Sequence, residues 1–75
     1  MNKVQFLFIG FVKGKKEKGS KLYAVGHIMQ GDTPDPMLTW IEVPKDQYDV
    51  QNTYEPLEYY DVTPVISGRY VSYTL

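Results

Sequence analysis

Apolar and polar residues alternate along this chain with a period of two, and no window shows a helical repeat of useful length. Valine, isoleucine, threonine and aromatic residues, which favour strands, are abundant, and glycine- or proline-containing turns separate their runs. The pattern predicts five strands, over residues 3–13, 22–29, 37–43, 53–66 and 69–75.

The first predicted strand is apolar on both faces. One face carries Val4, Phe6, Phe8, Gly10 and Val12, and the other carries Gln5, Leu7, Ile9 and Phe11. Two apolar faces are typical of a central strand that is covered on both sides. Gly10, in the middle of the strand, indicates a bend or bulge of the kind that barrel closure requires.

The later strands also alternate between two faces, and prolines limit their extent. On the second strand, Leu22, Ala24, Gly26 and Ile28 share one face, and Tyr23, Val25, His27 and Met29 share the other. On the last strand, the residues expected to point inward are Val71, Tyr73 and Leu75. Pro44 ends the third strand, and Pro56 and Pro64 give parts of the fourth strand edge status. Residues 44–52 are polar and have room for one helical turn.

These elements predict a single all-β domain over residues 1–75. Five closely spaced strands without a crossover helix indicate an antiparallel barrel or sandwich. A seven-stranded sandwich needs about 100 residues, and this chain has 75. We therefore predict a five-stranded, OB-like Greek-key barrel.

Small size and composition lead us to expect self-association. A chain of 75 residues buries little apolar surface, and such chains rely on disulfides, a metal or association. The chain has no cysteine and one histidine, His27, so disulfides and an ordinary zinc site are excluded within one chain. No apolar run approaches the roughly 20 residues that span a bilayer. We predict a soluble, cytoplasmic homodimer with no membrane partner.

Charge is unevenly distributed, although the net charge is only −1. Residues 1–30 carry six lysines against one glutamate, a net of +5, whereas residues 31–75 carry two basic and eight acidic side chains, a net of −6. This asymmetry indicates a polyanion-binding region beside an acidic one. The alternative is a solvated surface whose charges are unevenly ordered along the sequence.

The residue types that carry catalysis are scarce. His27 lies in a predicted strand, which is typical of a half-buried structural histidine. No serine lies in a nucleophile-elbow motif, and no glycine–lysine loop for phosphate is present. We predict a binding protein, not an enzyme, with no cofactor, metal or small-molecule substrate.

Basic residues concentrate between the first two predicted strands. They are Lys13, Lys15, Lys16, Lys18 and Lys21. Lysines in such a loop can bind phosphates and release counterions, which gives salt-dependent affinity without sequence readout. The alternative is that they solubilise a hairpin tip and block edge-to-edge pairing.

Aromatic residues border this basic loop. Phe11 lies at its base, Tyr23 on the returning strand and Trp40 on the next strand. Such rings can stack on nucleic-acid bases, and the alternative is core or dimer packing. Three further tyrosines lie among carboxylates, which repel phosphates, so we expect them in a protein–protein contact. They are Tyr54, Tyr59 and Tyr60.

The run Lys18-Gly19-Ser20-Lys21-Leu22-Tyr23 resembles the basic hairpin of the filamentous-phage single-stranded DNA-binding proteins. A preceding strand that opens with Lys3-Val4, and a late tyrosine-rich strand followed by a glycine turn, extend the resemblance over nearly the whole chain. The resemblance implies a helix-less OB-like barrel, a twofold dimer and cooperative coating of single-stranded DNA in a bacterial host. It also implies that Lys18, Lys21 and Tyr23 are hairpin contacts and that Arg69 is a basic residue near the last strand.

The first hypothesis is therefore a non-sequence-specific single-stranded DNA-binding protein, with RNA as the other possible ligand. The predicted nucleic-acid-binding residues are Phe11, Lys13, Lys15, Lys16, Lys18, Lys21, Tyr23, Trp40 and Arg69. The alternative is a phage- or mobile-element-encoded interaction module or inhibitor that uses the acidic, tyrosine-rich second half.

Overall fold

The computed structural model describes residues 3–14 and 21–75, which form an almost entirely β structure. Its elements, in chain order, are β1 (Val4–Lys13), β2 (Leu22–Gln30), β3 (Thr33–Pro34), β4 (Thr39–Val43), the 3-10 helix η1 (Lys45–Asn52), β5 (Tyr59–Ser67) and β6 (Tyr70–Thr74). No helix among these residues is long and apolar enough to cross a membrane.

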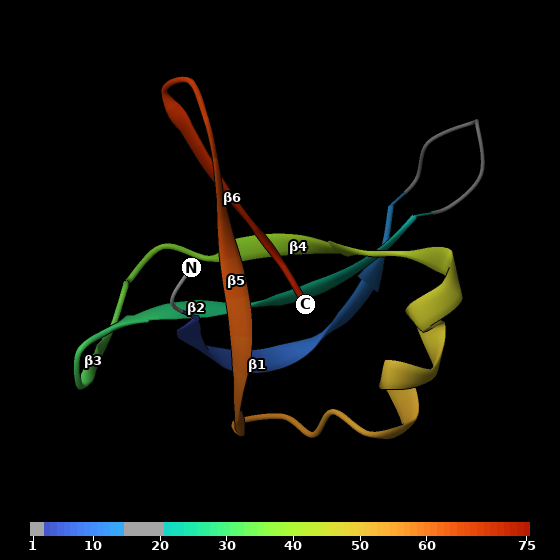
Figure 1. The fold of residues 1–75 in the computed structure, drawn as a ribbon. Helices are drawn as coiled ribbons and strands as arrows, with labels where there is room; N and C mark the ends of the chain where they lie inside the picture. The colour runs from blue at the N-terminus through green and yellow to red at the C-terminus, as the bar shows by residue number, and fades with distance from the viewer. Residues whose placement is uncertain (1–2, 15–20) are drawn as a thin grey trace.

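The strands form one curled antiparallel sheet (Figure 1). Its order is β3-β2-β1-β5-β6, and β4 pairs with β2 on the side away from β1. The sheet curls into a half-barrel, which confirms the all-β, OB-like prediction. In the described part of the chain, β4 and β6 each pair with one neighbour only, so the barrel stays open between them.

A β-bulge in β1 determines which side chains enter the core. Phe8 lies opposite Gly26 and Gly10 lies opposite Val25, so Ile9 is the extra residue on β1. The bulge predicted around Gly10 is confirmed, but it reverses the alternation beyond it. Phe11 therefore joins Phe8 on the core side, with ring centroids 4.7 Å apart.

The bulge also corrects two predictions for β1. Val12, expected on the same face as Phe6 and Phe8, is 38% exposed, and Ile9 is 41% exposed. β1 does lie centrally, between β2 and β5. Cover on both faces was nevertheless a wrong expectation, because a half-barrel has a single core on its concave side and solvent on the other.

The core lies inside the curl of the sheet. Its buried residues are Phe6, Phe8, Leu22, Ala24, Ile28, Ile41, Val43 and Val62. Of the two faces of β2, the one with Leu22, Ala24 and Ile28 enters the core. Tyr48 and Val50 of η1 pack against this core, so η1 covers one end of the half-barrel.

η1 and the segment after it differ from the prediction. The 3-10 segment runs from Lys45 to Asn52, longer than the single turn expected, with a kink at Gln47. β5 begins only at Tyr59 and not at residue 53. Leu57 has a φ of 68°, and its backbone N–H donates to the Phe8 carbonyl oxygen over 2.7 Å, which turns the chain into the sheet.

The second half of β5 and β6 leave the half-barrel as a projecting hairpin, residues 63–74, which we call the arm (Figure 1). β1 pairs with β5 only as far as Val62. Pro64 lies beyond this point, where the lack of a backbone N–H disturbs no central ladder, and its predicted edge position is confirmed. Tyr73 and Leu75 pack against the core as predicted, whereas Val71 points beyond the core and is 54% exposed.

Candidate nucleic-acid interface

The outer face of β2 and β4 presents an exposed aromatic pair. Ile41 and Val43 are buried, and Trp40 and Glu42 alternate with them, so Trp40 must project outward from β4. The Tyr23 ring, on the outer face of β2, meets the Trp40 ring edge to face, with centroids 6.4 Å apart and planes at 74°. Trp40 is nevertheless 57% exposed, so packing against Tyr23 leaves much of its surface open to a ligand.

Basic groups lie beside this pair. Lys21 is two residues before Tyr23 and so shares its face of the chain. The Lys21 carbonyl accepts a hydrogen bond from the Gly14 N–H over 2.8 Å, which joins the two ends of the β1–β2 connection. Lys13, the last residue of β1, pairs with Leu22 in the same ladder. Lys21 therefore lies beside Tyr23 on the outer face, whereas Lys13, at the same end of the sheet, shares the face of the buried Leu22.

A carboxylate also belongs to this face. Glu42 lies opposite Tyr23 in the β2–β4 register, and its Oε1 is 3.7 Å from Nζ of Lys21. Both side chains are more than half exposed. Solvent screening limits such a pair to about 0–1 kcal/mol, so Lys21 remains available to a competing anion.

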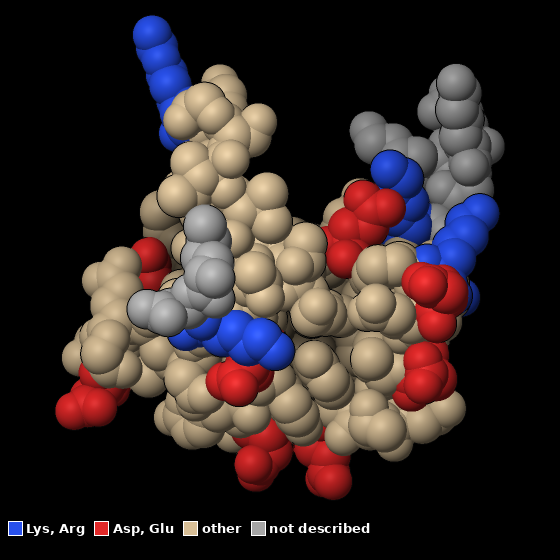
Figure 2. All heavy atoms as spheres, viewed as in Figure 1, with Lys and Arg blue, Asp and Glu red and all other residues tan. Residues whose placement is uncertain are grey.

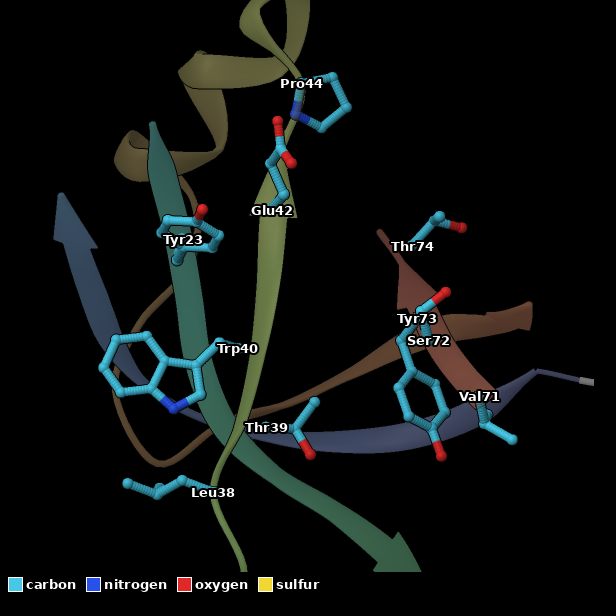
Figure 3. Close-up of a pocket in the computed structure, with 10 residues that line it drawn as sticks. All are labelled: Tyr23, Leu38, Thr39, Trp40, Glu42, Pro44, Val71, Ser72, Tyr73 and Thr74. Atoms are coloured by element: carbon cyan, nitrogen blue, oxygen red, sulfur yellow. The ribbon is translucent and has the colours of Figure 1, made fainter. Parts of the chain in front are cut away.

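A groove of about 730 Å³ opens where β4 and β6 fail to pair. Figure 3 shows Tyr23 and Trp40 on the side of β4 that faces away from β6. Thr39 and Tyr73 project into the gap between β4 and β6. Among the described residues that line it, Glu42 is the only charged one. Figure 2 shows the hollow above this groove, with an uncharged floor, the arm on one side and both signs of charge on the other.

The structure brings three of the predicted binding residues to one face and separates three others. Lys21, Tyr23 and Trp40 lie on the outer face of β2 and β4. Lys13 lies at the same end of the sheet but opposite the buried Leu22, and so on the core-side face. Arg69 lies at the tip of the arm, on the other side of the groove, in the turn between β5 and β6. Phe11 lies on the opposite, core side of the sheet. Three predicted lysines lie outside the described residues: Lys15, Lys16 and Lys18.

Phe11 belongs to an aromatic cluster that stabilises the fold. Its ring lies 6.1 Å from that of Tyr54, and the Tyr54 and Tyr60 rings are stacked, 3.9 Å apart and 3° from parallel. Phe8 meets both tyrosines edge to face. Tyr54 and Tyr60 therefore pack within the chain, and only Tyr59 of the three tyrosines expected at a protein contact is exposed, at 52%.

Because of the stacked tyrosines, the stability of the fold changes with pH in the alkaline range. Burial raises the pKa of Tyr54 above its ordinary value of 10.0, and repulsion from Tyr60 raises it further. The unfolded chain loses this proton at a lower pH than the folded chain, so stability is full below pH 10 and falls as pH rises above it. We expect Tyr54→Phe to make the free energy of unfolding fall less steeply with pH, as measured by urea unfolding at pH 9–11. Tyr70→Phe, at a 78% exposed position, is the matched control, and equal slopes for the two variants would contradict the prediction.

His27 stabilises a loop. Its Nδ1–H donates to the Asp35 carbonyl oxygen over 2.7 Å, and the Asp35 carboxylate accepts from the Gln30 side chain over 3.0 Å. These bonds hold the loop after β3 against β2. Among the described residues, no three His, Cys, Asp or Glu side chains gather closely enough to hold a metal ion.

Two residues of this region were not predicted as part of the site. Leu38 is 47% exposed and lies before β4, on the same alternating face as Trp40, so the sequence pattern contained its signal. Tyr73 enters the groove because the arm crosses near β4, a long-range arrangement that local alternation does not encode.

Comparison with known proteins assigns no family. No protein-family model, curated protein or solved structure matches this chain. Its function is therefore inferred from the geometry of the outer face alone.

Proposed function

We propose that this protein binds single-stranded DNA, without sequence specificity, on the outer face of β2 and β4. The observation that carries the proposal is Trp40, which is 57% exposed in the middle of a strand, edge to face with Tyr23 and near Lys21. Proteins that bind single strands combine aromatic platforms for the bases with cations for the backbone. This face offers both.

The platform consists of Tyr23 and Trp40, without Phe11. The edge-to-face contact fixes the Tyr23 and Trp40 rings at a steep angle, so a base that stacks on Trp40 lies beside the edge of Tyr23. Phe11 is turned towards Phe8 and the core, where a base has no access. Stacking tolerates every base because each has a π-face, and this supports binding without sequence readout.

Phosphate contacts come from cations at both sides of the platform. Lys21 exchanges its exposed and therefore weak pairing with Glu42 for a phosphate. Lys13 adds a positive charge at the same end of the sheet, on its other face, and Arg69 stands on the other side of the groove. Because each phosphate contact releases counterions, affinity falls as salt increases.

Replacing Trp40 by alanine should weaken binding to a labelled oligo(dT) by about 5- to 150-fold, because one base–aromatic stack contributes about 1–3 kcal/mol. Fluorescence anisotropy of the labelled oligonucleotide measures this without the tryptophan signal. Trp40→Phe keeps a ring and should retain most of the affinity. Tyr59→Ala removes a similarly exposed ring on β5, two strands away from β2, and should change affinity less than twofold.

Equal affinities of Trp40→Ala and the unmodified chain would contradict the platform. No binding by the unmodified chain at low salt would contradict nucleic-acid binding as a whole, and would favour the interaction module that uses the acidic second half. A parallel titration with oligo(U) distinguishes the two nucleic acids, since tighter binding to oligo(U) would replace DNA with RNA as the ligand.

A further inference from the structure

A single carboxylate, that of Glu42, lies beside the two rings of the outer face. Glu42 follows Trp40 by two residues on β4 and so shares its face, and it lies directly opposite Tyr23 in the β2–β4 register (Figure 3). The Cβ atoms of directly opposite residues are about 5 Å apart. A base that stacks on the rings therefore has one edge within reach of this carboxylate.

The Glu42 carboxylate repels a DNA strand unless the strand gives it a hydrogen-bond donor. Its partner in the free protein is Nζ of Lys21, 3.7 Å away, and both side chains are more than half exposed. When Lys21 turns to a phosphate, Glu42 loses this partner. A carboxylate accepts hydrogen bonds and donates none. Within a DNA strand the phosphates and sugars have acceptors only, so the new donor must come from a base.

Guanine is the base whose free edge matches a carboxylate. In a single strand the Watson–Crick edge of an unstacked base is open to hydrogen bonding. On guanine this edge has two adjacent donors, N1–H and N2–H, which fit the two oxygens of one carboxylate. On cytosine and adenine an amino donor lies beside a ring-nitrogen acceptor, and on thymine N3–H lies between two carbonyl oxygens. These acceptors repel a carboxylate, so the other three bases fit less well.

We propose that Glu42 selects guanine for the position on Tyr23 and Trp40 by accepting hydrogen bonds from N1–H and N2–H of the stacked base. One nucleotide then takes both halves of the Lys21–Glu42 pair, with its phosphate on Lys21 and its base edge on Glu42. Hydrogen bonds to a charged acceptor are stronger than those between neutral groups. The other bases of the strand stay unread, so the protein still binds any single strand. This inference rests on the proposed function, because it needs a base on the two rings.

The test compares a short labelled oligo(dT) with the same oligonucleotide carrying one central guanine, by fluorescence anisotropy at one salt concentration. We expect the guanine strand to bind about 5-fold tighter, the lower end for a bidentate contact to a base, because Glu42 is exposed. Hypoxanthine lacks the N2 amino group of guanine, and its strand should bind with intermediate affinity. Glu42→Gln replaces one of the two acceptor oxygens with a donor and should bind the guanine and thymine strands equally.

Glu58→Gln is the matched control. It removes the same charge from an exposed residue just before β5, two strands away from β2, and should keep the preference for guanine. A strand with adenine in the central position separates hydrogen bonding from stacking. Adenine is a purine like guanine but has no pair of adjacent donors, so its strand should bind more weakly than the guanine strand.

Three results would overturn the inference and leave the proposed function standing. They are equal binding of the guanine and thymine strands by the unmodified chain, a guanine preference that survives Glu42→Gln, and adenine binding as tight as guanine binding, which would assign the preference to stacking. If neither strand bound at low salt, the proposed function itself would fail and this inference with it. Near-UV circular dichroism of Trp40 and the tyrosines shows whether each variant is folded.

Discussion

Replacement of Phe8 by alanine should lower the free energy of unfolding by about 3–5 kcal/mol, the range for phenylalanine truncations in cores. The Phe8 side chain is 1% exposed and contacts the rings of Phe11, Tyr54 and Tyr60. Its removal leaves a cavity where β1, the segment before β5 and β5 itself meet. Small domains have net stabilities of about 5–15 kcal/mol, so this loss takes a large part of the total.

Urea denaturation followed by tryptophan fluorescence measures the loss as a lower midpoint at an unchanged slope. Ile9→Ala is the matched control, because Ile9 is the next residue along β1 but projects from the bulge and is 41% exposed. We expect a loss of about 1 kcal/mol or less there, as for partly exposed sites outside the core. If Ile9→Ala destabilised the chain as much as Phe8→Ala, the face reversal at the bulge would be wrong.

This pair of residues shows how far alternation predicts the fold. In β2 and β4 the sequence grouped Leu22 with Ala24 and Ile41 with Val43, and the structure buries each of these groups together. In β1 the glycine indicated a bulge, but not which residue would be the extra one. A single inserted residue moves every later residue of the strand to the opposite face. Phe11 and Val12 were therefore assigned to the wrong sides.

The candidate site was predictable to the same extent. The sequence named Tyr23 and Trp40 as candidate stacking rings and left packing as the alternative; the structure puts both on the outer face of adjacent strands. Tyr23 and Glu42 lie opposite each other because of the β2–β4 register, and the groove forms because the whole sheet curls. Both are long-range properties, set by the bulge and by the point where β1 stops pairing with β5.

Gly26→Ala should destabilise the protein by about 3 kcal/mol, the upper end of the range for overpacking, because backbone must move to accept the new methyl group. A Cβ at Gly26 would overlap the carbonyl oxygen of Leu7 and lie 2.8 Å from Cζ of Phe6. Gly26 lies opposite Phe8, next to the bulge, so β1 approaches β2 closely at the point where it changes face. Relieving the overlap therefore displaces the strand that carries Phe6 and Phe8.

The matched control is Gly10→Ala, in the same bulge. A Cβ there meets no atom within 4 Å, and alanine removes backbone freedom from the unfolded chain. We expect Gly10→Ala to be neutral or to stabilise by up to about 1 kcal/mol. Thermal and urea unfolding of both variants compare the two glycines directly. A loss at Gly26 no larger than at Gly10 would show that β1 and β2 do not approach this closely, and the position of the bulge would have to be assigned again.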